Sequence, residues 1–68
     1  MVRYDERIRI GKIVSSIRES KGLSQEELAE ITGFTKGTII RIELGKFGVP
    51  IDVLATIAEA LGKHVELV

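Results

Sequence analysis

Residues 24–46 have the sequence SQEELAEITGFTKGTIIRIELGK, which carries the strongest structural signal in this 68-residue chain. Ser24 and Glu27 have the spacing of a capping box, in which the side chain of each residue accepts a hydrogen bond from the backbone N–H of the other at the start of a helix. This spacing predicts a helix over residues 25–32. Gly33 then ends that helix, because glycine accepts the left-handed backbone that closes many helices.

A second short helix is predicted over residues 36–44, because Thr35 is a suitable N-cap. Apolar residues recur at the helical spacing i, i+3, i+4 in both flanking segments, which predicts helices over residues 5–21 and 50–61. A glycine closes each of the four helices: Gly22, Gly33, Gly45 and Gly62. The sequence therefore predicts one compact all-α domain of four helices over residues 1–68.

The tail, residues 63–68, changes from helical to alternating spacing. Val65 and Leu67 alternate with polar neighbours, which predicts a short C-terminal β-strand. A single strand is not stable without a partner strand. The partner is either the same tail of a second copy, giving a homodimer through Val65, Leu67 and Val68, or the N-terminal residues 2–4.

The composition narrows the possible classes of protein. Ten basic and ten acidic residues balance, so overall charge does not by itself indicate a nucleic-acid partner. With no cysteine and His64 as the only histidine, we expect no metal site and no cofactor. Glu26 and Glu30 have no histidine or second carboxylate group beside them to complete an active site, so no catalytic residue is expected. Without a membrane-length apolar run or a secretion leader, the expected location is cytoplasmic.

The segment that spans residues 10–62 resembles the phage-repressor, Cro-like helix-turn-helix family of the XRE type. The similarity rests on RESKGLSQ at residues 18–25, Leu28–Ala29, Gly33, Thr38–Ile39, Arg41–Ile42–Glu43, Gly45–Lys46 and Ala60–Leu61–Gly62. The resemblance implies a lambda-repressor-like DNA-binding domain. Its second short helix, residues 36–44, would then lie in the major groove of double-stranded DNA.

The resemblance also implies which residues contact DNA. Base contacts are expected from Lys36, Gly37, Thr38, Ile40 and Arg41, and phosphate contacts from Ser24, Gln25, Thr35, Lys46 and Phe47. Lys36 and Arg41 can both donate hydrogen bonds to guanine. Gly37 replaces a residue that is often a polar base reader in the family, and Ile40 is apolar on the outward face. Few hydrogen-bonded base contacts per copy are therefore expected.

Two further pairs of residues are interpreted from the family pattern. Arg18 and Glu43 resemble a pair that the family joins in a partly buried ion pair between its first and third helices. That pair would set the angle of the recognition helix. Ile31 and Thr32 are exchanged relative to the usual apolar order, so Ile31 is expected to be partly exposed.

These features together predict a sequence-specific DNA-binding transcriptional regulator, a repressor that binds a palindromic operator as a homodimer. A narrower alternative is an antitoxin that binds a toxin protein and represses its own promoter. An alternative from another class is a protein-interaction module that no longer binds DNA, which the neutral charge, Gly37 and Ile40 favour. An enzyme is the remaining interpretation, and the sequence offers no candidate catalytic group for it.

Overall fold

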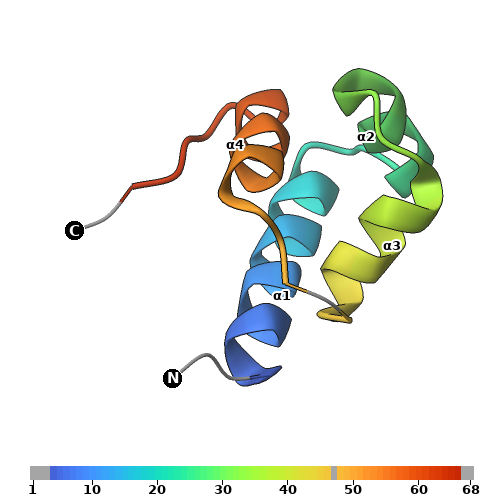
Figure 1. Ribbon diagram of the computed structural model, residues 1–68. Helices are drawn as coiled ribbons and strands as arrows, with labels where there is room; N and C mark the ends of the chain where they lie inside the picture. Colours follow the sequence, from blue (N-terminus) through green and yellow to red (C-terminus); the bar gives the residue numbers. More distant parts are fainter. Residues whose placement is uncertain (1–3, 47, 67–68) are drawn as a thin grey trace.

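The computed structural model describes residues 4–46 and 48–66. Within these residues the chain forms four helices: α1 (Tyr4–Ser20), α2 (Gln25–Thr32), α3 (Lys36–Leu44) and α4 (Ile51–Ala60) (Figure 1). The two short helices occupy the ranges expected from the sequence, and the two flanking helices differ from expectation by one residue at each end. The expected all-α arrangement of four helices is confirmed.

Capping hydrogen bonds explain why the short helices begin where they do. Ser24 Oγ accepts a hydrogen bond from the backbone N–H of Glu27 at 3.0 Å, and Glu27 Oε1 accepts one from the backbone N–H of Ser24 at 2.8 Å. Thr35 Oγ1 accepts one from the backbone N–H of Thr38 at 3.1 Å. Gly33 closes α2 with φ of 81°, a conformation that residues with a Cβ rarely adopt.

The hydrophobic core lies between the packed helices. Helix α3 packs against α1 and α2, and α2 packs against α4 (Figure 1). The apolar side chains buried between these helices are Val14, Leu28, Ala29, Ile39, Ile42, Ile57 and Leu61. Ile39 and Ile42 are 0% and 1% exposed, so one face of α3 is sealed inside the protein. The opposite face of α3 is thereby presented outward on a rigid support.

Helix α1 lies close to α3 at Gly11. A Cβ atom at this position would lie 2.5 Å from the carbonyl oxygen of Ile42 and 2.6 Å from that of Glu43. Both distances are too short for non-bonded atoms, so a larger residue would push the two helices apart. A glycine inside a helical pattern costs helix stability and often has a packing reason. That isolated glycine is the signal by which the sequence could have indicated this contact.

The tail does not form the predicted strand within the described residues. Residues 63–66 have no regular secondary structure, are exposed, and extend away from the helices (Figure 1). The physical reason is that no other strand lies beside them among the described residues, and a lone strand is unstable. The alternative partner strand for the tail was residues 2–4. Tyr4 is the first residue of α1, so this alternative is wrong at Tyr4. Leu67 and Val68 lie outside the described residues.

Candidate nucleic-acid interface

A buried ion pair holds α3 against α1. Arg18 Nε donates to Glu43 Oε2 at 2.7 Å, and Arg18 Nη2 donates to Glu43 Oε1 at 3.1 Å. Arg18 Nη1 donates to the carbonyl oxygen of Leu23 at 2.7 Å, so all three guanidinium nitrogens are used. The two side chains are 9% and 5% exposed. The hydrogen bonds with Glu43 raise the pKa of Arg18 above its usual value, so this buried guanidinium remains charged.

Gln25, the first residue of α2, joins the same ion pair. Its Nε2 donates to Glu43 Oε1 at 2.9 Å. Arg18, Gln25 and Glu43 therefore connect α1, α2 and α3 in one network, which we call the junction. Gln25 was predicted from the sequence to bind a phosphate, and its bond to Glu43 was not predicted. The amide keeps one N–H and its carbonyl oxygen for another partner, so the phosphate contact stays a prediction.

Helix α3 carries the five residues predicted to contact bases. Lys36 and Arg41 are exposed, whereas Gly37, Thr38 and Ile40 are half-buried. Ile40, which was expected on the outward face, is thus partly covered. The hydroxyl oxygens of Thr35 and Thr38 lie 3.0 Å apart in a hydrogen bond, which restrains both side chains beside the start of the helix.

The predicted phosphate-contacting residues lie around this face. Ser24 and Thr35 are exposed at the N-terminal ends of α2 and α3, where helix dipoles favour anions. Each hydroxyl already accepts a capping bond and can still donate one. Lys46 is exposed just beyond α3. Phe47 lies outside the described residues.

Arg7 is a basic residue near this face that the sequence analysis did not select. A Cβ atom on Gly48 would lie 3.6 Å from Arg7 Nη2, which places the Arg7 guanidinium beside the loop that follows α3. The helical pattern of α1 shows that Arg7 belongs to that helix. It does not show which loop packs against it, so no signal in the sequence identified this position.

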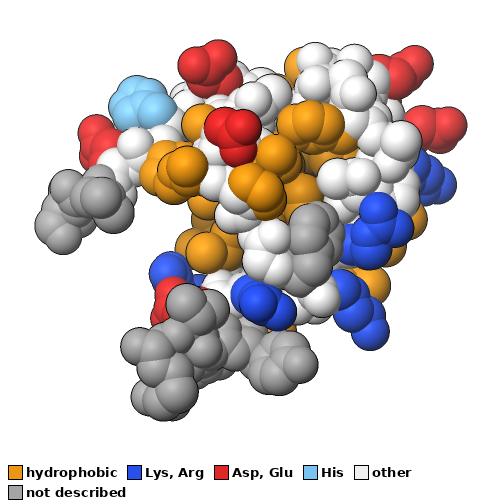
Figure 2. Space-filling view, in the orientation of Figure 1, with side chains coloured by type: hydrophobic (Ala, Val, Ile, Leu, Met, Phe, Trp, Pro, Cys, Tyr) orange, Lys and Arg blue, Asp and Glu red, His pale blue; other side chains and the backbone are white. Residues whose placement is uncertain are grey.

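Charge is unevenly distributed although the chain is neutral overall. Between residues 36 and 46 there are three cations, Lys36, Arg41 and Lys46, while the only acid there, Glu43, is buried and paired. The exposed acids of α2 are Glu26, Glu27 and Glu30. Figure 2 shows basic side chains along the α3 side of the molecule, at the right, and acidic side chains mainly at the top. The outward face of α3 is therefore a local basic surface.

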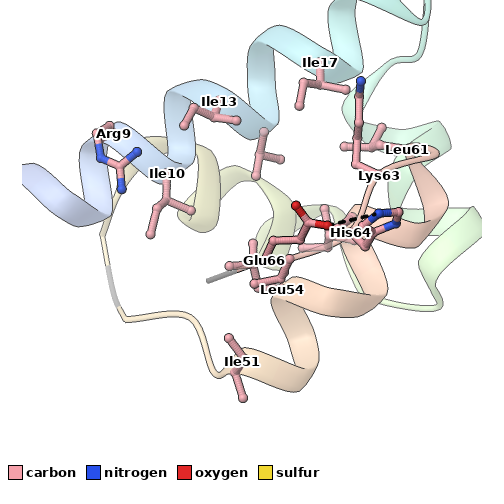
Figure 3. A pocket seen from close by; sticks show the side chains of 14 residues that line it. Arg9, Ile10, Ile13, Ile17, Ile51, Leu54, Leu61, Lys63, His64 and Glu66 are labelled. Carbon is pink, nitrogen blue, oxygen red and sulfur yellow. Dashed lines mark ion pairs between the residues drawn. The ribbon is translucent and has the colours of Figure 1, made fainter. Parts of the chain in front are cut away.

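A second surface is apolar and lies on another side of the molecule. Helix α1, helix α4 and residues 63–66 enclose a groove of about 440 Å³ (Figure 3). Ile13, Ile51 and Val65 line it and are 44%, 67% and 37% exposed. His64 and Glu66 lie at its edge, with His64 Nε2 3.8 Å from Glu66 Oε2. The groove forms because α1 packs against α3 and makes few contacts with α4.

Residues 4–46 and 48–66 contain neither a membrane-spanning helix nor a metal-binding cluster. None of the helices there has the length and apolar character needed to cross a membrane. The same residues contain no group of three or more His, Asp or Glu side chains that could hold a metal ion.

Residues 14–68 match the family described as Helix-turn-helix, and the chain belongs to that family. An uncharacterised HTH-type transcriptional regulator of Methanothermobacter thermautotrophicus is 42% identical over 55 residues, which cover 79% of this chain and 80% of that protein. The family resemblance expected from the sequence is therefore confirmed.

Solved structures have the same fold. The restriction-modification controller protein C.AhdI from Aeromonas hydrophila matches with a TM-score of 0.85 and 30% identity, covering 90% of this chain and 88% of that one. A chain of a toxin-antitoxin module from Streptococcus pneumoniae matches with a TM-score of 0.76 and 33% identity, covering 94% and 70%. Both similarities extend over most of the length of this chain.

Proposed function

We propose that this chain is a sequence-specific DNA-binding transcriptional regulator, not an enzyme, and that its α3 enters the major groove. The observation that carries the proposal is the basic outward face of α3, held at a set angle by the buried Arg18–Glu43 pair. A helix supported in this way and carrying exposed cations fits the groove and attracts phosphates. The HTH-type regulator from Methanothermobacter thermautotrophicus supports the same role. Such a regulator works in the cytoplasm, where it meets chromosomal DNA.

The proposed contacts divide into two sets. Base edges are contacted by Lys36, Gly37, Thr38, Ile40 and Arg41, and phosphates by Ser24, Gln25, Thr35, Lys46 and Phe47. Arg7 is added to the second set, because its guanidinium lies beside the loop after α3. Phosphate contacts position the protein, whereas base contacts supply sequence preference. With two cations among the base-contacting residues, one copy supplies few hydrogen bonds to bases.

The sparse base contacts favour a homodimer that represses from a palindromic operator. In this proposal Val65, Leu67 and Val68 of one tail pair with the same residues of a second copy in a short antiparallel ribbon. The tail extends away from the helices, and Val65 belongs to the apolar groove, so a second copy would cover both. The rim of the groove carries Arg9 and Lys63 as well as Glu66, charges that can pair across a two-fold axis.

A second candidate function is the antitoxin of a toxin-antitoxin pair that also represses its own promoter. The similarity to a chain of the toxin-antitoxin module from Streptococcus pneumoniae favours it. Ile31, which is 57% exposed as the sequence analysis expected, offers an apolar contact away from the outward face of α3. The test is to express the reading frame next to this gene alone and together with this chain. Growth arrest that this chain relieves supports the antitoxin function, and unaffected growth contradicts it.

The proposed function is tested by selecting binding sites for the purified chain from random double-stranded DNA. Enrichment of a palindrome supports a sequence-specific homodimer, and enrichment of a single half-site supports binding as a monomer. Affinity for the enriched duplex should fall steeply as salt rises, because bound phosphates release counterions. Absence of enrichment at low salt would contradict the proposal and favour a protein-interaction module that has lost DNA binding.

A further inference from the structure

Gly37 occupies a position where a glycine needs an explanation. It is the second residue of α3, and a glycine inside a helix costs up to about 1 kcal/mol relative to alanine. Its backbone is helical with negative φ, so the turn geometry does not require glycine. The related family often has a polar base-reading side chain here. The environment of Gly37 therefore has to supply the reason.

The guanidinium group of Arg41 lies over Gly37. A Cβ atom at position 37 would lie 3.6 Å from Arg41 Nη1 and 3.8 Å from Thr35 Oγ1. Residues 37 and 41 are four apart, so they occupy the same face of the helix. Long helical side chains also point toward the helix N-terminus, which brings the guanidinium of Arg41 back over the first turn of α3.

The space over Gly37 is limited on its other side. Thr35 Oγ1 is held by its capping bond to the N–H of Thr38 and by the hydrogen bond to Thr38 Oγ1. A methyl group at position 37 would sit at ordinary contact distance from both neighbours. A branched side chain would place further carbon atoms where the guanidinium now lies. The glycine thus leaves room for one particular group, which is the planar end of Arg41.

We propose that Gly37 and Arg41 act as one guanine-reading unit, an inference that rests on the DNA-binding function proposed above. Gly37 leaves the space in which the guanidinium lies flat across the first turn of α3, the part of a recognition helix that faces base edges. From there the guanidinium donates two parallel hydrogen bonds to O6 and N7 of a guanine. Arg41 in this way takes the role of the missing side chain at position 37. Lysine cannot replace it, because an ammonium group lacks the planar fork.

The test uses the duplex recovered by selection from random DNA and the same duplex with its most strongly selected guanine replaced by 7-deazaguanine. This base lacks the N7 acceptor. Dissociation constants are measured for the wild type, Arg41→Ala, Arg41→Lys, Gly37→Ala, Gly37→Val and the double variant Gly37→Val with Arg41→Ala. Melting temperatures show that each variant is folded.

We expect Arg41→Ala and Gly37→Val each to weaken binding roughly 5- to 150-fold and to abolish the penalty for 7-deazaguanine. Arg41→Lys should also lose that penalty. Gly37→Ala should weaken binding far less than Gly37→Val, because its methyl group fits beside the guanidinium. The double variant should bind no worse than either single variant, because both substitutions remove the same contact.

Three results would overturn the inference. If Arg41→Ala keeps the penalty for 7-deazaguanine, Arg41 is not the group that reads guanine. If Gly37→Ala loses as much as Gly37→Val, the glycine serves a close approach of the DNA backbone and not the placement of Arg41. If the effects of the two substitutions simply add, the residues act separately. A wild type that enriches no sequence would instead overturn the proposed function itself.

Discussion

The junction and the outward face both include residues of α3, but different forces define them. At the junction Glu43 is almost completely buried and receives hydrogen bonds from Arg18 and Gln25. On the outward face Lys36 and Arg41 are exposed to solvent. Internal contacts therefore determine the first region before any partner binds. The second region faces solvent, where a partner can reach its cations.

Two glycines, Gly11 and Gly37, show the same contrast between internal packing and the outward face. Gly11 is required because the backbone of α3 lies within 2.6 Å of where its Cβ would be. Gly37 has a flexible side chain as its nearest neighbour, at an ordinary contact distance. One glycine thus serves the packing of the helices, and the other serves the outward face. Alanine substitutions at the two sites should have opposite effects on stability.

The largest effect is expected from breaking the ion pair at the junction. Glu43→Ala would leave the guanidinium of Arg18 buried without its partner, which costs about 3–5 kcal/mol of unfolding free energy. Urea denaturation followed by circular dichroism measures this loss. Glu66→Ala is the control, because the Glu66 side chain is 66% exposed and should change stability little. An unchanged melting temperature for Glu43→Ala would contradict the role given to the pair.

A domain of this size has little stability to lose, so a double variant completes the experiment. Arg18→Met together with Glu43→Leu removes both charges and leaves none unpaired. Replacing a buried ion pair by apolar residues is often neutral or stabilising. The double variant should therefore be more stable than Glu43→Ala alone. If it is less stable, the pair contributes more than the avoidance of a buried charge.

The next largest effect is expected at the contact between α1 and α3. Gly11→Ala gains helix propensity but forces a methyl group against the carbonyl oxygens of Ile42 and Glu43. Overpacking of this kind costs about 1–3 kcal/mol, which exceeds the gain in propensity of about 1 kcal/mol. Thermal denaturation should show a lower melting temperature. A melting temperature above that of the wild type would mean that the two helices can separate without cost.

A loss of similar size is expected from removing the third member of the junction. Gln25→Ala deletes one hydrogen bond to the Glu43 carboxylate, and bonds to charged groups contribute about 1.5–3 kcal/mol. We expect a value at the low end, because Arg18 still binds both carboxylate oxygens. Urea denaturation beside Glu43→Ala ranks the two contributions. A loss equal to that of Glu43→Ala would show that Gln25, and not Arg18, dominates the junction.

The smallest effect has the opposite sign. Gly37→Ala should raise the unfolding free energy by up to about 1 kcal/mol, because the methyl group fits and alanine restricts the unfolded chain. Comparing Gly37→Ala with Gly11→Ala tests the same substitution in α3 and in α1. A destabilised Gly37→Ala would show that the outward face is packed as tightly as the junction.

The parts of the fold that could be predicted from the sequence are those that local residues determine. The bounds of α2 and α3 follow from Ser24, Thr35 and Gly33, whose effects act within a few residues of the chain. The isolated Gly11 signals a close contact but not its partner, and both that partner and the bond from Gln25 to Glu43 depend on the angle between helices. Sequence similarity to a family identified the Arg18–Glu43 pair, whereas spacing alone would not have done so.

Only part of the candidate site could be predicted from the sequence. The position of Lys36 and Arg41 on one exposed face follows from helical periodicity. The placement of the Arg41 guanidinium over Gly37 does not, because it depends on a side-chain conformation. The tail alternates as a strand does, but residues 63–66 are irregular in the single chain. Alternation supplies the spacing of a strand but not its partner, and no strand lies beside residues 63–66 among the described residues.

We propose that the outward face of α3 is the DNA-binding surface and that the junction only supports it. Titration of the ¹⁵N-labelled chain with its selected duplex, followed by backbone amide chemical shifts, distinguishes this surface from the apolar groove. We expect the largest shifts at residues 24–25, 35–41 and 46, with small shifts at Ile13 and Ile51 in the apolar groove. Shifts concentrated in the groove, with residues 36–41 unaffected, would contradict it.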